Sequence, residues 1–146
     1  MMTYRQIELN DINQLFVVRS STDENNLSCR QLYALGITEG SVKEKLCSSY
    51  TGWLCEFNGK IIGFAIGDKS TGEVWVIAVL PEYINRGIGT KLLSLVENWL
   101  WNSGCTKLWL ETDIDPKLRA YSFYKKNGWQ DDYMENELRY MKKVKT

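Results

Sequence analysis

Residues 73–91 read EVWVIAVLPEYINRGIGTK, and this stretch decides the fold. Its first eight residues form an almost wholly apolar run, which is typical of a strand buried at the centre of a sheet. Pro81 ends the run, and Gly87 and Gly89 open a segment whose apolar residues have helical spacing. The stretch therefore predicts a central strand, a short loop and a helix that begins at a glycine pair.

A glycine pair at a helix start has a chemical use. Glycine lets the backbone approach a ligand closely, and the first N–H groups of the helix point outward with a partial positive charge. Together these features suit a phosphate or pyrophosphate. Two other phosphate loops are excluded, because Thr90 follows Gly89 where a Walker A loop needs lysine, and Leu92 stands where a dinucleotide fingerprint needs a small residue. A tight turn before the helix is the alternative interpretation.

The remaining pattern predicts a mixed α/β chain. An Asn58-Gly59 turn between two apolar runs is typical of a β-hairpin. No linker or repeat interrupts residues 1–146, so we expect one domain. Besides the central strand, strands are expected at 3–9, 51–57, 60–68, 107–112, 129–133 and 138–144. Helices are expected at 11–20, at 39–49, from 88 to the glycine at 104, and at 117–127, whereas 21–37 shows little periodicity.

Composition excludes several classes of function. The 18 basic and 18 acidic residues balance, which argues against a nucleic-acid partner. Histidine is absent, so Ser-His-Asp and Cys-His mechanisms and histidine-ligated metal sites are excluded, and we expect no metal. The N-terminus has no signal-peptide pattern, and no apolar run is long enough to cross a membrane. These patterns predict a cytoplasmic protein with reduced cysteines and no membrane partner.

Two separated motifs resemble the GNAT N-acetyltransferase superfamily. The first is VIAVLPEYINRGIGTKLL at 76–93, and the second is AYSFYKKNGW at 120–129. The resemblance implies an α/β (α+β) fold with a mixed, mostly antiparallel sheet of about six or seven strands and about four helices. It also implies acetyl-coenzyme A in a gap between two splayed parallel strands. Acetyl-coenzyme A is therefore the expected co-substrate.

The resemblance assigns residues to that co-substrate. The pyrophosphate is expected on the loop and helix start at Asn85, Arg86, Gly87, Ile88, Gly89 and Thr90, and the pantetheine arm on the strand at Ile77, Ala78 and Val79. Ile84 replaces the usual Gln or Arg of the first motif, and an isoleucine cannot contact phosphate. Lys117 replaces the usual Asn of the second motif, and we expect it to meet a phosphate instead.

The expected reaction is direct attack of an amine on the thioester in a ternary complex. Tyr124 matches the tyrosine that protonates the coenzyme A sulfur in many relatives, and its alternative interpretation is core packing. Glu73 matches the base glutamate of some relatives. Glu111, Asp113 or a water chain are the alternatives as base. The Val79 N–H is the expected oxyanion donor by resemblance, and strand alternation predicts Glu73 on the same face as Ile77 and Val79.

The acceptor is inferred from charge alone. Residues 111–137 carry seven acids, Asp131 and Asp132 among them, and in this fold they are expected near the acceptor mouth. That favours a small cationic amine such as a polyamine, an aminoglycoside or an amino-acid-like molecule. A protein N-terminus or lysine is the alternative acceptor, and an acyl-coenzyme A-binding module without turnover is a further alternative. Because relatives often pair, a homodimer also stays open.

Overall fold

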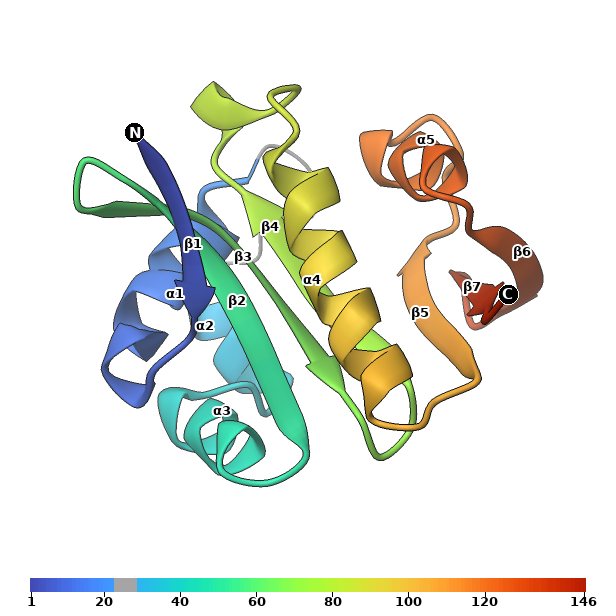
Figure 1. Cartoon of the computed structure of the whole chain (residues 1–146), viewed down its shortest axis with the longest axis horizontal. Coiled ribbons are helices and arrows are strands. Elements are labelled where there is room, and N and C mark those ends of the chain that lie inside the picture. Colours follow the sequence, from blue (N-terminus) through green and yellow to red (C-terminus); the bar gives the residue numbers. More distant parts are fainter. Residues whose placement is uncertain (23–28) are drawn as a thin grey trace.

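The computed structural model describes residues 1–22 and 29–146 (Figure 1). The strands are β1 (Met2–Gln6), β2 (Tyr50–Phe57), β3 (Lys60–Asp68), β4 (Glu73–Val79), β5 (Lys107–Asp113), β6 (Gln130–Glu135) and β7 (Leu138–Val144). The α-helices are α1 (Ile12–Ser20), α2 (Cys29–Ala34), α3 (Glu39–Leu46), α4 (Ile88–Asn102) and α5 (Arg119–Lys126). Short 3-10 turns precede α1 and follow β4, namely η1 (Leu9–Asp11) and η2 (Pro81–Tyr83).

The strands form one mixed sheet in the order β1-β2-β3-β4-β5-β7-β6. Every neighbouring pair is antiparallel except β4 and β5, which run parallel. The expectation of a mostly antiparallel sheet of six or seven strands is confirmed. The described residues contain one α-helix more than the four expected, because α2 lies in the polar stretch 21–37, whose sequence lacks a clear apolar period.

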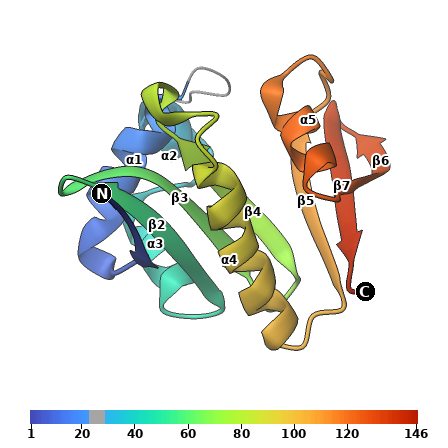
Figure 2. The same ribbon diagram turned by 45° about the horizontal axis from the view of Figure 1, so that its top comes forward.

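Helices cover the two faces of the sheet differently. The helix α4 lies on one face of β2, β3 and β4, and α1, α2 and α3 lie on the other (Figures 1 and 2). The inner side of α4 is fully buried at Leu92, Val96 and Leu100, as the helical spacing predicted. The Asn58-Gly59 turn between β2 and β3 has both residues at positive φ, 53° and 77°, so the predicted hairpin is confirmed.

A β-bulge in β4 changes which side chains share a face. Gly67 of β3 pairs with Val74 and Ile66 pairs with Val76, so Trp75 is an extra residue in β4. A Cβ on Gly67 would lie 2.6 Å from a side-chain atom of α4, so Val74 is on the α4 side. The predicted simple alternation is therefore wrong, because the extra residue reverses the faces beyond it.

The bulge places Glu73 on the opposite face of the sheet from Ile77 and Val79, although the sequence predicted all three on one face. Glu73 pairs with Asp68 on the α1–α3 side of the sheet. Ile77 and Val79 pair with Ala65 and Gly63, and both lie on the α4 side. The sequence could not give this result, since a bulge has no signature in an apolar run.

The parallel neighbours β4 and β5 touch only where they begin. Their single pairing is between Glu73 and Trp109, supported by a 3.1 Å hydrogen bond from the Trp109 N–H to the Gly72 carbonyl. Beyond it the two strands diverge, and β5 continues its pairing with β7 (Figure 2). The edge of β4 that faces β5 is therefore left without a strand partner toward the C-terminal end of β4.

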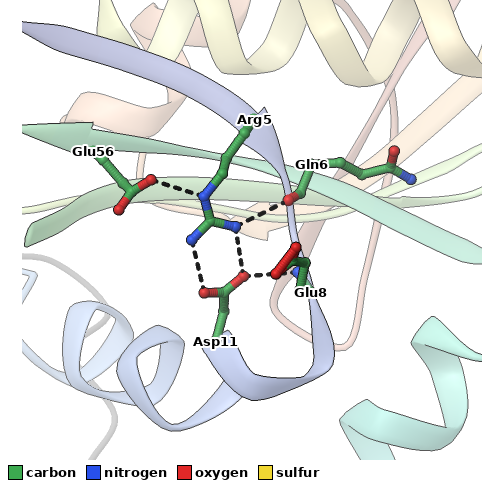
Figure 3. A network of polar contacts seen from close by, with 5 residues as sticks. All are labelled: Arg5, Gln6, Glu8, Asp11 and Glu56. Carbon is green, nitrogen blue, oxygen red and sulfur yellow. Dashed lines mark hydrogen bonds and ion pairs between the residues drawn. The ribbon is translucent and has the colours of Figure 1, made fainter. Parts of the chain in front are cut away.

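A network around Arg5 ties the first strand to the start of α1 (Figure 3). Arg5 donates to both carboxylate oxygens of Asp11 at 2.9 Å and to Glu56 of β2 at 2.7 Å. Asp11 also accepts a 2.7 Å hydrogen bond from the Glu8 N–H, and these bonds lower the pKa of its buried carboxyl. The network fixes where α1 begins against the sheet.

The last helix begins later than predicted. Residues 117–127 were expected to be helical, but α5 begins at Arg119. The Asp113 carboxylate accepts from the Asp115 N–H, and the Asp115 carboxylate accepts from the Lys117 N–H, both at 2.9 Å. These side-chain turns occupy N–H groups in an irregular loop and delay the helix.

Candidate active site

A cleft of about 660 Å³ opens where β4 and β5 diverge. One wall is formed by β4 and the loop that leads into α4, and the opposite wall by the end of β5 and by α5. The cleft thus lies where the central strand and the glycine pair were predicted to bind a ligand.

The loop before α4 has a backbone suited to an anion. Asn85 and Gly87 both have positive φ, 62° and 81°, which turns successive N–H groups outward. The Lys91 N–H makes the first bond of the helix, 3.0 Å to the Gly87 carbonyl. The N–H groups of 88–90 therefore precede the helical hydrogen-bond ladder, in the first turn. Their dipoles favour a negatively charged group.

The free edge of β4 offers backbone groups to the same cleft. The Leu80 N–H bonds the Ile62 carbonyl at 2.9 Å, and antiparallel pairs alternate between bonded and non-bonded residues. By that alternation Val79 and Ile77 turn their N–H and C=O groups away from β3, toward the diverging β5. An extended ligand can add to this edge as a short strand.

Most of the predicted cofactor residues line the cleft. Eight do so: Ile77, Ala78, Val79, Asn85, Gly87, Gly89, Thr90 and Tyr124. The side chain of Ile88 is instead buried in the core, and the Arg86 guanidinium lies over the Tyr83 ring at 5.2 Å. Lys117 is held in the loop before α5 and does not line the cleft either. At residues 86 and 88 only the backbone N–H groups are therefore candidates for the pyrophosphate, and the Lys117 side chain is exposed.

The sequence analysis missed a row of three α5 side chains on the opposite wall of the cleft. Arg119, Phe123 and Lys126 of α5 all line the cleft. Their spacing of four and three residues places them on one helix face, which is a signal that the sequence contained. The Phe123 ring lies so near the glycine loop that a Cβ on Gly89 would be 3.2 Å from it. The row adds two cations to a cleft that already offers N–H groups.

Tyr124 sits at the inner end of α5 among other rings. Its ring meets those of Phe123 and Trp129 edge-on, with centroids 5.3 and 6.1 Å away. Burial in this apolar setting raises the pKa of Tyr124 to about 12. The side chain both packs in the core and lines the cleft, so the two interpretations of this residue are compatible.

A pair of carboxylates lies beside the diverging strands. Burial, and next the negative charge of Glu111, raise the pKa of Glu73 to about 7, against the opposing effect of Lys45. Glu73 itself lines neither the cleft nor the cavity beside it, whereas Glu111 lines both. Glu111, like Asp113, is therefore open to a ligand in either space, and Glu73 interacts with Glu111 from outside both.

A second cavity, of about 340 Å³, adjoins the cleft on the α1–α3 side of the sheet. The two share six lining residues, Arg19, Trp75, Val76, Glu111, Thr112 and Asp113. Trp75 and Val76 are consecutive, and both reach this side because of the bulge. The arrangement provides room for two ligands that meet at Glu111.

The acids expected at an acceptor mouth mostly lie elsewhere. Asp131 accepts from the Tyr121 hydroxyl at 2.9 Å and pairs with Arg139, and Asp132 pairs with Lys107 at 3.6 Å. Of the seven acids only Glu111 and Asp113 line either space. The sequence placed these acids together by position in the chain, but the β6–β7 hairpin carries four of them away, and Asp115 lies in the loop before α5.

Among residues 1–22 and 29–146, no helix is both long and apolar enough to cross a membrane. Nor does this part of the chain bring three or more Cys, Asp or Glu side chains together in a group that could hold a metal ion.

Comparison with known sequences gives one family and several relatives. The family described as "Acetyltransferase (GNAT) family" matches residues 21–129, a range that includes both motifs and confirms the resemblance. Uncharacterized N-acetyltransferase MJ1530 of Methanocaldococcus jannaschii is 33% identical over 82 residues, or 54% of this chain and 52% of that protein. Acetyltransferase ECA0875 of Pectobacterium atrosepticum is 33% identical over 72 residues, or 47% and 51%. The chain spans about half the length of these relatives.

Solved structures match over nearly the whole chain. PaiA N-acetyltransferase of Thermoplasma acidophilum, in complex with coenzyme A, has a TM-score of 0.85 at 17% identity and covers 99% of each chain. Ribosomal-protein-S18-alanine N-acetyltransferase of Escherichia coli has a TM-score of 0.74 at 21% identity, over 97% of this chain and 92% of that one. At these identities the likeness concerns the fold.

Proposed function

Since the chain belongs to the GNAT acetyltransferase family, we propose that it moves an acetyl group from acetyl-coenzyme A to a primary amine. The observation that carries the proposal is the cleft itself, which combines the N–H groups at the start of α4 with an unpaired edge of β4. The proposal takes residues 1–146 as one catalytic domain, since a single sheet includes both β1 and β7.

The residues present fit coenzyme A. Its pyrophosphate suits the N–H groups of residues 87–90, and the amides of its pantetheine arm suit the backbone of Ile77 and Val79. Arg119 and Lys126 add positive charge on the facing wall of the same cleft, and we assign them to the phosphates in place of the missing Gln or Arg at Ile84. Coenzyme A is also the ligand of the PaiA structure, which supports this choice.

The amine must lose a proton before it can attack, because an alkylammonium has a pKa near 10. We assign the proton acceptor to the Glu73–Glu111 pair. Glu111 lines the junction of the two spaces, and Glu73, with a pKa of about 7, lies outside both. The negative charge of Glu111 is one cause of the raised Glu73 pKa, so the two carboxylates interact directly. A base with a pKa near 7 is well matched to neutral pH.

In the transfer step the amine nitrogen bonds to the thioester carbonyl carbon, and the carbon–sulfur bond breaks. The backbone N–H of Val79, on the free edge of β4, is the proposed donor to the carbonyl oxygen as it becomes negative. Tyr124 is the proposed partner of the leaving sulfur. With a pKa of about 12 it stays protonated, and beside a thiol whose ordinary pKa is near 8.5 it serves as a hydrogen-bond donor that stabilises the thiolate.

Thermal-shift titration tests the cofactor half of this proposal. A ligand that binds only the folded state stabilises it by about 2.7 kcal/mol at 100 times its Kd. For a domain of this size the expected rise in Tm is about 5–10 °C. Acetyl-coenzyme A and coenzyme A should both produce it, whereas AMP, the nucleotide control, should not. No rise at millimolar acetyl-coenzyme A would refute the proposal, and release of free thiol on addition of amines tests the transfer itself.

A further inference from the structure

The cavity beside the cleft has a polar end and an apolar end. Twelve of its sixteen lining residues have apolar side chains. The four others, Arg19, Glu111, Thr112 and Asp113, all belong to the part of the lining that the cavity shares with the cleft. Away from the cleft the lining is wholly apolar and includes Phe16, Val42 and Phe64.

This arrangement fixes the orientation of an occupant. A primary amine reaches the acetyl group only at the junction, where Glu111 and Asp113 supply negative charge. The rest of the molecule must then extend between α1, α3 and the sheet, where Phe16, Val42 and Phe64 offer no hydrogen-bond partner. An apolar body is stabilised there, whereas a second ammonium group would lose its hydration without gaining a partner.

The size of the cavity agrees with one compact body. A cavity of roughly 150 Å³ lined by aliphatic and aromatic side chains is enough to bind benzene. This cavity, at about 340 Å³, has room for a ring or a branched aliphatic chain together with the linker to the nitrogen. A bulky aminoglycoside would not fit its apolar end.

We infer that the acceptor is a primary amine with a single positive charge and an apolar body, bound with its nitrogen at Glu111 and Asp113 and its body against Phe16, Val42 and Phe64. This inference rests on the proposed acetyl transfer and narrows its acceptor. It replaces the polyamine and aminoglycoside expected from the acids of 111–137, five of which lie outside both spaces. The same chemistry occurs in free alkyl- and arylalkylamines and in a peptide that begins with an apolar residue.

A homologous series of amines tests the inference by release of free thiol from acetyl-coenzyme A. Each methylene buried between propylamine and hexylamine should raise kcat/KM about fourfold, or about sixtyfold over the series. Cadaverine, the diamine of the same length as hexylamine, should be at least about a hundredfold poorer than hexylamine. A flat series, or cadaverine equal to hexylamine, overturns the inference. Leucine-initiated and glycine-initiated tripeptides distinguish the sources, because a peptide source predicts that the leucine peptide exceeds hexylamine.

A matched pair of variants tests the position of the body. Val42→Phe fills the apolar end and should lower kcat/KM for hexylamine at least about tenfold more than kcat/KM for propylamine. Val17→Phe places the same ring on the exposed side of α1, where Val17 is 62% exposed, and should change neither. Equal loss for both amines in Val42→Phe would contradict the inference.

Thermal-shift titration with coenzyme A distinguishes failure of the proposed function from failure of the inferred acceptor. A protein that shows no thermal shift with coenzyme A refutes the proposed function itself. A protein that binds coenzyme A but neither turns over hexylamine nor gains a further thermal shift from it refutes only the inferred acceptor.

Discussion

Glu73→Gln should make the protein more stable above neutral pH while impairing its proposed chemistry. Burial and the Glu111 charge raise the pKa of Glu73 from an ordinary 4.5 to about 7. A carboxyl whose pKa is raised on folding binds protons more tightly in the folded state. Its contribution to the free energy of unfolding is therefore fully present below pH 4.5 and is lost as the pH rises through 7. Glutamine keeps the shape of the protonated acid and cannot ionise, so it avoids that loss.

The size of the effect follows from the two pKa values. A difference of about 2.5 corresponds to about 3.4 kcal/mol at 1.36 kcal/mol per pKa unit. The side chain is only partly buried, so screening by solvent reduces this to about 2 kcal/mol. For a chain of this length that equals a rise in Tm of about 4–8 °C at pH 8. At pH 4 the variant and the native protein should have equal Tm.

Thermal unfolding between pH 4 and 8 measures this difference, and Glu44→Gln is the control. Glu44 is an exposed glutamate of α3, and its replacement should change stability by less than about 0.5 kcal/mol at every pH. The same preparations give the rate of thiol release, which should fall below pH 7 in the native protein and lose that dependence in Glu73→Gln. A Tm difference that is constant between pH 4 and 8 would refute the reasoning, because it would show that the folded state does not shift the Glu73 pKa.

Three further predictions concern the buried Glu97, with Asp132 as its surface control, and the cleft residues Tyr124 and Gly89. Glu97 is buried and accepts from Trp129 at 2.9 Å and from Lys143 at 2.8 Å, so Glu97→Ala should lower the free energy of unfolding by about 3 kcal/mol in urea titration. Asp132→Ala, which removes only surface ion pairs, should lower it by less than about 0.5 kcal/mol. Tyr124→Phe should reduce kcat for thiol release about 10–100-fold and leave the Kd for acetyl-coenzyme A within about threefold. Gly89→Val should weaken that Kd at least about tenfold in calorimetry, because its side chain would press on a ring of the facing helix.

For each of these variants, one result would contradict the prediction. Equal losses for Glu97→Ala and Asp132→Ala would mean that the buried contacts of Glu97 add nothing. A Tyr124→Phe enzyme of undiminished kcat would remove Tyr124 from the chemistry. Unchanged binding by Gly89→Val would place coenzyme A away from the start of α4.

The sequence predicted the elements near the site better than those at the front of the chain. The strand at Glu73–Val79, the Asn58-Gly59 hairpin and the helix from Ile88 have strong local signals, namely an apolar run, a positive-φ dipeptide and a regular apolar period. By contrast, α2 lies in a polar stretch with no such period. The start of α5 was misplaced because the side chains of Asp113 and Asp115 compete for backbone N–H groups.

Local spacing determined the backbone of one wall of the cleft, because an apolar run, a glycine pair and a helix start are all features of neighbouring residues. From them the position of Gly87 and Gly89 at the start of α4 followed without any knowledge of tertiary contacts. Only the tertiary structure decided the proposed acceptor side. The bulge at Trp75, the divergence of β5 from β4 and the ion pairs of Asp131 and Asp132 all depend on contacts between different strands. Side-chain direction and cavity shape result from such packing, and no pattern along one strand or helix can fix them.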